Sequence, residues 1–141
     1  MESVFYYMPT IYIESISHMK KEFVDFVCNI HGYLIRIKEI HWNTENNSEH
    51  KLCDEIEDDL HGCEDRFMEC CMGMSGEHFQ IGDLLPMLPS SKELIPMLKE
   101  LEKDILDMKK KIDGPENGGL FNVLDDMQEC CNKYKYRATQ K

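Results

Sequence analysis

Apolar side chains recur at helical spacing along most of this chain, and that periodicity is the feature that most constrains its fold. Near the amino terminus they lie three, four or seven residues apart, at Ile16, Phe23, Val27, Ile30, Leu34, Ile37 and His41. This spacing places them on one face of a helix. We therefore expect a long first helix that begins near Ser15 or Ser17, either of which is a suitable cap, and ends near His41.

A polar turn at residues 43–48 separates this helix from a second one, which we expect from Glu49 to Met72. The second helix has an apolar stripe of its own, made of Cys53, Ile56, Leu60, Cys63, Phe67 and Cys71. Gly73 and Gly76 follow it, and glycine is the residue that most often ends a helix.

The second half of the chain predicts two more helices. Ser90 and Glu93 resemble a capping box that opens the third, in which Pro96 should kink the first turns or shift the start. Its apolar positions are Leu94, Leu98, Leu101, Ile105, Met108 and Ile112. The fourth begins near Gly119 and carries Leu120, Leu124, Met127, Cys131 and Tyr134.

The connection at residues 73–91 is long and rich in Gly, Pro and Ser, yet it keeps apolar residues, so we expect it to be packed. Four amphipathic helices with one long middle connection predict an all-α, ferritin-like four-helix bundle, because such a connection allows a crossover along the bundle. We expect an amino-terminal arm at residues 1–14 and a single bundle domain at 15–141.

Composition excludes several classes of function. The formal net charge is −11, with 27 acids against 16 bases, which argues against binding to nucleic acid or to an anionic membrane. We expect neither a membrane span nor a signal peptide. Seven cysteines, an odd number, indicate reduced thiols and a cytoplasmic, reducing compartment.

The second helix concentrates the negative charge, with ten acids and two bases between Glu45 and Glu69. At about 100° per residue, five polar side chains fall within an arc of roughly 80°, opposite the apolar stripe. We call this set the acidic ridge: Asp54, Asp58, His61, Asp65 and Glu69. The ridge should therefore point away from the core of its own bundle.

A solvated helix face is the simplest interpretation of such a charge run. However, like charges four residues apart repel one another, and two histidines adjoin the ridge, since His50 precedes Asp54 by four residues and His41 ends the preceding helix. Carboxylates and imidazoles together are ligands for Fe(II), Mn(II) or Zn(II). Because the ridge faces outward, closing a metal site there needs a second protein surface, most simply an identical one across a two-fold axis.

The motifs of this region resemble those of the Dps proteins, the mini-ferritins named for DNA protection in starved cells. Their pattern is an H-W-N tripeptide ending the first helix, then H-x3-D, ten intervening residues and D-x3-E. Here His41-Trp42-Asn43 is followed by the two pairs His50-x3-Asp54 and Asp65-x3-Glu69. The specific resemblance covers about 30 residues, from His41 to Glu69.

The resemblance implies a ferroxidase centre between two subunits, which oxidises Fe(II) with hydrogen peroxide or dioxygen and stores the ferric product. One chain would supply His41, His50 and Asp54, and its two-fold mate Asp65 and Glu69. Trp42 would pack beside the centre, with Asp58 and His61 as accessory or solvated groups. The resemblance also implies that the chain forms a homo-oligomer, at least a two-fold dimer. Members of the family form a cage of twelve subunits, and the ridge alone does not predict such a cage.

Two alternatives stay open at this level. A cysteine-rich second helix, with Cys70 where the family usually has arginine after the last ligand, also fits a non-catalytic ferritin-like structural or interaction protein. Because the ligands do not choose the metal, a zinc- or manganese-binding variant without redox turnover fits as well.

Overall fold

The computed structural model describes residues 21–80, 82, 85–112 and 114–140. Within them the chain forms α2 (Lys21–Asn43), α3 (Asn47–Ser75), α4 (Leu94–Lys111), the short 3-10 helix η2 (Pro115–Asn117) and α5 (Gly118–Ala138), with no strand. The predicted all-α class is therefore confirmed. The expected arm at 1–14 and the start of the first helix, including Ser15, Ile16 and Ser17, lie outside the described residues.

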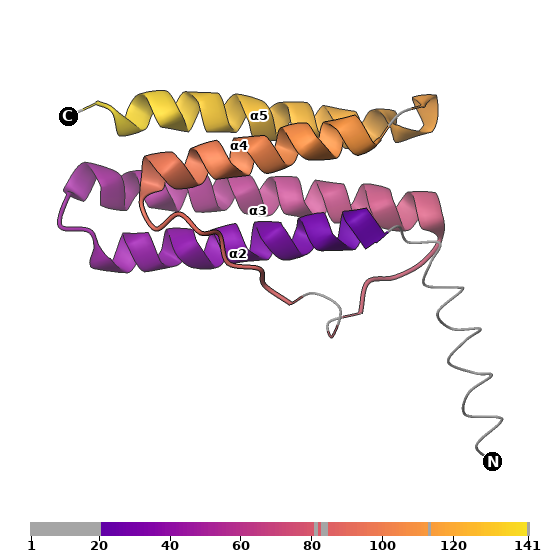
Figure 1. Ribbon diagram of the computed structural model, residues 1–141, viewed down its shortest axis with the longest axis horizontal. Helices are drawn as coiled ribbons and strands as arrows, with labels where there is room; N and C mark the ends of the chain where they lie inside the picture. Colours follow the sequence, from indigo (N-terminus) through magenta and orange to yellow (C-terminus); the bar gives the residue numbers. More distant parts are fainter. Residues whose placement is uncertain (1–20, 81, 83–84, 113, 141) are drawn as a thin grey trace, which may run out of the picture.

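The four long helices lie side by side as a bundle (Figure 1). α2 packs against α3 and α4, and α5 packs against the same two helices from the other side. α3 and α4 run in the same direction, so the connection between them travels back along the bundle and passes α2 on the way (Figure 1). Among the described residues, no helix is long and apolar enough to cross a membrane.

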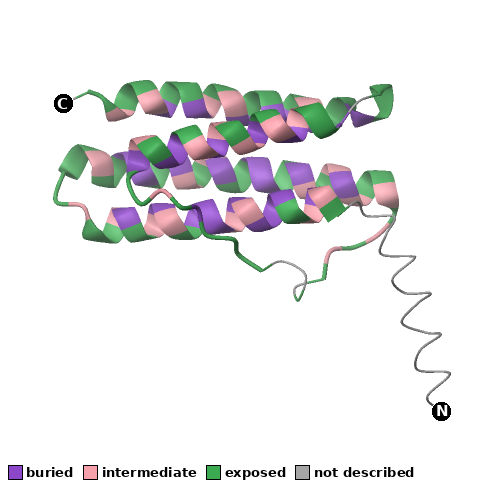
Figure 2. Ribbon diagram, in the orientation of Figure 1, coloured by how far each residue is buried: buried purple, intermediate pink, exposed green. Residues whose placement is uncertain are grey.

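The core lies where the apolar stripes of the four helices meet (Figure 2). The predicted stripe of the second helix is buried in full, from Cys53 to Cys71, as are the predicted apolar positions of α4 and α5. At one end, the rings of Phe23 and Phe26 pack on Phe67, with ring centroids 6.0 and 4.9 Å away. Burial of these stripes supplies the main favourable free energy of folding.

Helix ends follow the predicted chemistry in α3 but not in α4. The side chain of Asn46 accepts a hydrogen bond from the Glu49 amide, and Gly76 ends α3 in the left-handed conformation. The predicted capping box of α4 is wrong: the helix begins at Leu94 after Glu93, which makes no side-chain cap. Pro96 consequently stands in the first turn, where a missing amide hydrogen costs nothing.

The connection between α3 and α4 contacts α2 through its backbone. Its apolar side chains are less packed than predicted, since Leu85, Met87 and Leu88 are 67%, 58% and 60% exposed. The Met87 amide donates a hydrogen bond to the Cys28 carbonyl oxygen at 3.0 Å, and Arg36 donates to the Pro89 carbonyl oxygen at 3.2 Å. Gly32 is the α2 residue at this crossing: a Cβ atom there would lie 1.7 Å from the Met87 carbonyl oxygen. The close approach of connector and helix therefore requires glycine at this position.

Candidate metal centre

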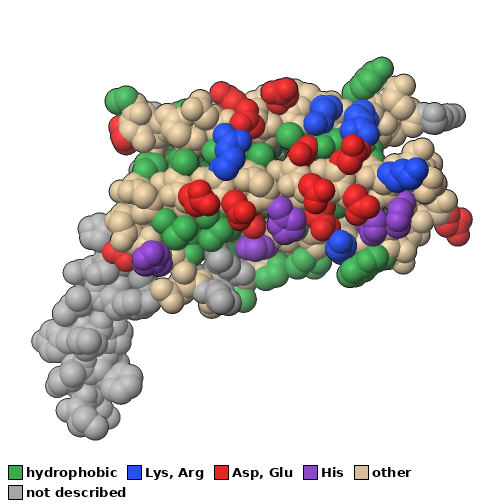
Figure 3. Space-filling view, turned by 180° about the vertical axis from the view of Figure 1, so that it is seen from behind, with side chains coloured by type: hydrophobic (Ala, Val, Ile, Leu, Met, Phe, Trp, Pro, Cys, Tyr) green, Lys and Arg blue, Asp and Glu red, His purple; other side chains and the backbone are tan. Residues whose placement is uncertain are grey.

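The acidic ridge lies on the outer surface of α3, as its spacing predicted. All five of its side chains are exposed: Asp54, Asp58, His61, Asp65 and Glu69. Figure 3 shows the corresponding face of the molecule, where acidic side chains follow one another along the middle helix with histidine side chains among and beside them. The apolar stripe of the same helix is buried on the opposite side.

His41 and His50 meet at the end of the bundle where the short turn joins α2 to α3. Their rings stack with centroids 3.9 Å apart and an interplanar angle of 22°. The Nδ1 atom of His41 lies 3.0 Å from the His50 carbonyl oxygen, and the Nδ1 atom of His50 lies 2.9 Å from the His41 carbonyl oxygen. Because a carbonyl oxygen only accepts, each Nδ1 donates its proton.

This pairing leaves the Nε2 atom of each neutral ring with a lone pair. Histidines that bind metals are commonly held in this way, since a hydrogen bond from the other ring nitrogen to a carbonyl fixes both tautomer and orientation. Two backbone carbonyl groups thus fix the orientation of the His41 and His50 rings. Each ring therefore keeps Nε2 as the nitrogen with which it can bind a cation.

A carboxylate completes the cluster at this end of the ridge. Asp54 lies one turn after His50 on α3, and its Oδ1 atom is 3.4 Å from Nδ1 of His41. The Asp54 side chain is largely exposed, whereas that of His41 is mostly covered. His41, His50 and Asp54 are therefore neighbours within one chain, but the Asp54 carboxylate contacts Nδ1 of His41 and not the Nε2 atom that would bind a cation.

The other two predicted ligands lie elsewhere on the same helix. Asp65 and Glu69 follow Asp54 by eleven and fifteen residues, which corresponds to about 16 and 22 Å along a helix. Within the described part of one chain, no three His, Cys, Asp or Glu side chains converge closely enough to hold a metal ion. A site that includes all five residues thus needs a second copy of the chain.

The predicted accessory residues are also at the surface. Trp42 is 72% exposed, and Asp58 and His61 are exposed on the ridge. The tryptophan is consequently not packed inside its own chain, and its expected place beside the centre stays a prediction.

Sequence reasoning missed a contact between α2 and α3, in which His31 Nε2 lies 3.5 Å from Oε2 of Glu64. Glu64 is only 6% exposed, and its desolvation raises the pKa of the carboxyl to about 7. Desolvation also lowers the pKa of His31, with the charge of His61 as a second cause. The available signal was that Glu64 adjoins the buried Cys63 and belongs to the apolar side of the helix.

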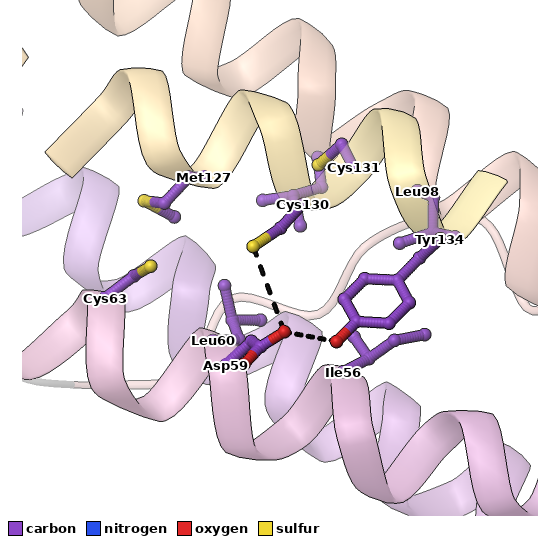
Figure 4. A pocket seen from close by; sticks show the side chains of 10 residues that line it. Ile56, Asp59, Leu60, Cys63, Leu98, Met127, Cys130, Cys131 and Tyr134 are labelled. Atoms are coloured by element: carbon purple, nitrogen blue, oxygen red, sulfur yellow. Dashed lines mark hydrogen bonds between the residues drawn. The ribbon is translucent and has the colours of Figure 1, made fainter. Parts of the chain in front are cut away.

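The cysteines around the small cavity between α3, α4 and α5 form a different environment (Figure 4). The cavity has a volume of about 10 Å³, the size of one water molecule. Burial raises the pKa of the Cys63 thiol to about 11 and that of Cys131 to about 12. Because metals bind the thiolate, these protonated thiols favour packing over a zinc site at neutral pH.

A protein-family model described as a family of unknown function (DUF5856) matches residues 41–138. The chain belongs to this family. The matched stretch begins at His41 and includes all five predicted ligands, whereas His31 lies before it. No curated protein and no solved structure matches the chain.

Proposed function

We propose that this protein is a Dps-like iron-binding protein that oxidises Fe(II) at a centre shared between two subunits and stores the ferric product. The observation that carries the proposal is the pair His41 and His50, whose rings each donate Nδ1–H to a carbonyl and keep Nε2 for a cation. They stand at one end of an outward-facing ridge whose other end carries Asp65 and Glu69.

A two-fold axis would bring the two ends of the ridge together. If two α3 helices pack antiparallel across an axis near Leu60 and His61, Asp54 of each chain lies opposite the segment between Asp65 and Glu69 of the other. Two identical centres then form in each dimer. The order of helices supports the same assignment, because α3 and α4 running in one direction with a crossover between them is the ferritin-like arrangement.

The chemistry of the residues suits Fe(II) as a substrate. Two Fe(II) ions, one hydrogen peroxide molecule and two protons give two Fe(III) ions and two water molecules, so each iron loses one electron and the peroxide O–O bond breaks. Carboxylates stabilise Fe(III) more than Fe(II), and the excess negative charge of the ridge concentrates cations at the surface. The Nε2 atoms of the His41 and His50 rings would bind the incoming ion.

The direct test is Fe(II) oxidation by the full-length protein. Fe(II) is added without oxygen, peroxide follows, and ferric absorbance is recorded for wild type and Asp65→Ala/Glu69→Ala. The control is Glu116→Ala/Glu129→Ala, which removes two exposed carboxylates outside the ridge. We expect fast oxidation in wild type and control and at least a tenfold loss in the ridge variant. Equal rates in all three would reject the proposal.

Mixing two inactive variants tests whether the centre is shared. His50→Ala/Asp54→Ala keeps one half of each centre, and Asp65→Ala/Glu69→Ala keeps the other half. A heterodimer of the two has one intact centre and one that has lost both halves. After exchange of subunits, we expect activity to return to about a quarter of wild type. Activity that stays at the level of the separate variants would place all the ligands within one chain and reject the shared centre.

A further inference from the structure

We propose a second divalent-cation site within each chain, formed by His31 and Glu64 with His61 as an additional ligand from the surface. His31 and Glu64 are not ligands of the shared centre, and His61 belongs to the ridge but is not one of the centre's five predicted ligands. The second site therefore does not depend on the proposed function, and it requires no second copy of the chain.

The first support is the separation of the two ligand atoms. Nε2 of His31 and Oε2 of Glu64 lie 3.5 Å apart. Two ligand atoms that each lie about 2.1 Å from one metal ion, at a tetrahedral angle, are about 3.4 Å apart. The contact thus has the span of two neighbouring ligands on a single cation, and it is longer than an ordinary hydrogen bond.

The second support is an unsatisfied buried oxygen. Glu64 is 6% exposed, and its Oε2 atom has no hydrogen-bond partner. A buried polar atom without a hydrogen-bond partner destabilises the folded state, and more so when the group is charged. The oxygen points toward His31, the side from which an ion would enter, since the His31 side chain is 32% exposed. A cation placed between the two residues would remove this cost.

His61 is placed to supply a further ligand. It precedes Glu64 by three residues on α3, which puts both on neighbouring positions of the helix surface. It lies close enough for its charge to act on both His31 and Glu64. The three side chains do not converge as they stand in the described structure. His61 is exposed in the single chain, where a rotation of its side chain toward Glu64 would complete the site.

This site is separate from the shared centre. Glu64 follows Asp54 by ten residues, about 15 Å along the helix. Its neighbour Asp65 points about 100° away around the helix and is exposed, whereas Glu64 is buried. An imidazole and a carboxylate suit Zn(II), Fe(II) or Mn(II), and Zn(II) is the convenient probe because it undergoes no redox change.

The experiment is chemical footprinting of histidine with diethyl pyrocarbonate, read by mass spectrometry, with and without Zn(II). It uses the full chain carrying Asp65→Asn/Glu69→Gln, which removes the two carboxylates of the shared centre that lie closest to Glu64 in the sequence, so that zinc bound by them cannot contribute. We expect Zn(II) to slow the modification of His31 at least fivefold. His78, an exposed histidine outside the cluster, serves as the control within the same molecule and should react at an unchanged rate.

A second measurement assigns the effect to Glu64. In the same background, Glu64→Gln keeps the size of the side chain but removes its charge, and it should abolish the protection of His31. Equilibrium dialysis should show one fewer Zn(II) per chain in Glu64→Gln than in its parent, whereas His78→Gln should match the parent. Equal modification of His31 with and without Zn(II) in the parent would overturn the site, whatever the activity of the shared centre.

Discussion

Two histidines at the α2–α3 turn owe their arrangement to the backbone. His41 and His50 each donate from Nδ1 to the carbonyl oxygen of the other residue, so their orientation is set by the turn that joins the helices. The position of this turn depends on Asn46, whose side chain caps α3 by accepting a hydrogen bond from the Glu49 amide. A single cap thus fixes where α3 begins and, with it, the position of the candidate ligands.

The raised pKa of Glu64 predicts that the free energy of unfolding depends on pH. This pKa is raised to about 7 in the folded protein, chiefly by desolvation, so the folded state holds the proton more tightly than the unfolded state. The contribution of Glu64 to stability is complete below the unfolded-state pKa and is lost as the pH rises through the folded-state pKa. We expect Glu64→Gln to match wild type at pH 5 and to exceed it by about 2 kcal/mol at pH 8.

Urea unfolding of both proteins at the two pH values, with a chelator present, measures this difference. Because each comparison is made at one pH, the other titrating groups largely cancel. A difference between the two proteins that is the same at pH 5 and pH 8 would contradict the assignment of a raised pKa to Glu64.

The hydroxyl group of Tyr134 leads to a second prediction about stability. This hydroxyl donates a hydrogen bond to the Asp59 carboxylate, and this contact joins α5 to α3 beside the small cavity (Figure 4). Removing the hydroxyl leaves the carboxylate, which is part-buried, without this donor. We expect Tyr134→Phe to lower the free energy of unfolding by about 1–2 kcal/mol.

The exposed Tyr136 offers the matched control, because Tyr136→Phe removes the same atom from the surface of the same helix. Its unfolding midpoint in urea should equal that of wild type. Two variants with equal stability would mean that the contact of Tyr134 with Asp59 contributes nothing.

At the scale of the helices, the crossing of the connector over α2 can be tested with two glycines. Gly32 has the Met87 carbonyl oxygen where a Cβ atom would lie, whereas Gly62 on α3 has open space there. Alanine is a better helix former than glycine by about 1 kcal/mol. We expect Gly62→Ala to stabilise the protein by up to that amount and Gly32→Ala to destabilise it by about 2 kcal/mol or more.

If the connector rests on α2, thermal unfolding should show a lower melting temperature for Gly32→Ala and a higher one for Gly62→Ala than for wild type. If Gly32→Ala raised the melting temperature as Gly62→Ala does, the connector would have to lie away from the helix, and the packed crossing would be wrong.

Sequence periodicity predicted the helices well because each apolar stripe is a local pattern. The grouping of His41, His50 and Asp54 came from the resemblance to the Dps motifs, and the short turn places these three residues next to each other. The sequence prediction failed at Ser90, because both Ser90 and Ser91 bind the distant Glu100 carboxylate instead of capping α4. The contact of His31 with Glu64 was missed for a related reason, since it depends on the register of α2 against α3.

For the molecule as a whole, the distribution of charge matters more than its total. Ten acids and two bases lie between Glu45 and Glu69, and the ridge presents five polar side chains of that segment to the surface. In the proposed dimer, two such ridges would face each other and repel until cations enter. Association of the chain and binding of cations should therefore be coupled, because each favours the other by the same free energy.

For the proposed dimer, this coupling predicts how association responds to ions. In chelator at low ionic strength, the wild-type dimer should be weak, and salt should strengthen it because the Debye length falls to about 8 Å at 0.15 M. Micromolar Mn(II), which adds almost nothing to the ionic strength, should strengthen it at least tenfold. Asp65→Asn/Glu69→Gln should dimerise more readily in chelator, since the repulsion is reduced, yet gain little from Mn(II). Sedimentation velocity over a range of protein concentrations measures these constants. A dimer equally sensitive to Mn(II) in both proteins would show that the ridge is not where the cation joins the two chains, whereas a chain that stays monomeric in every condition would exclude a shared centre altogether.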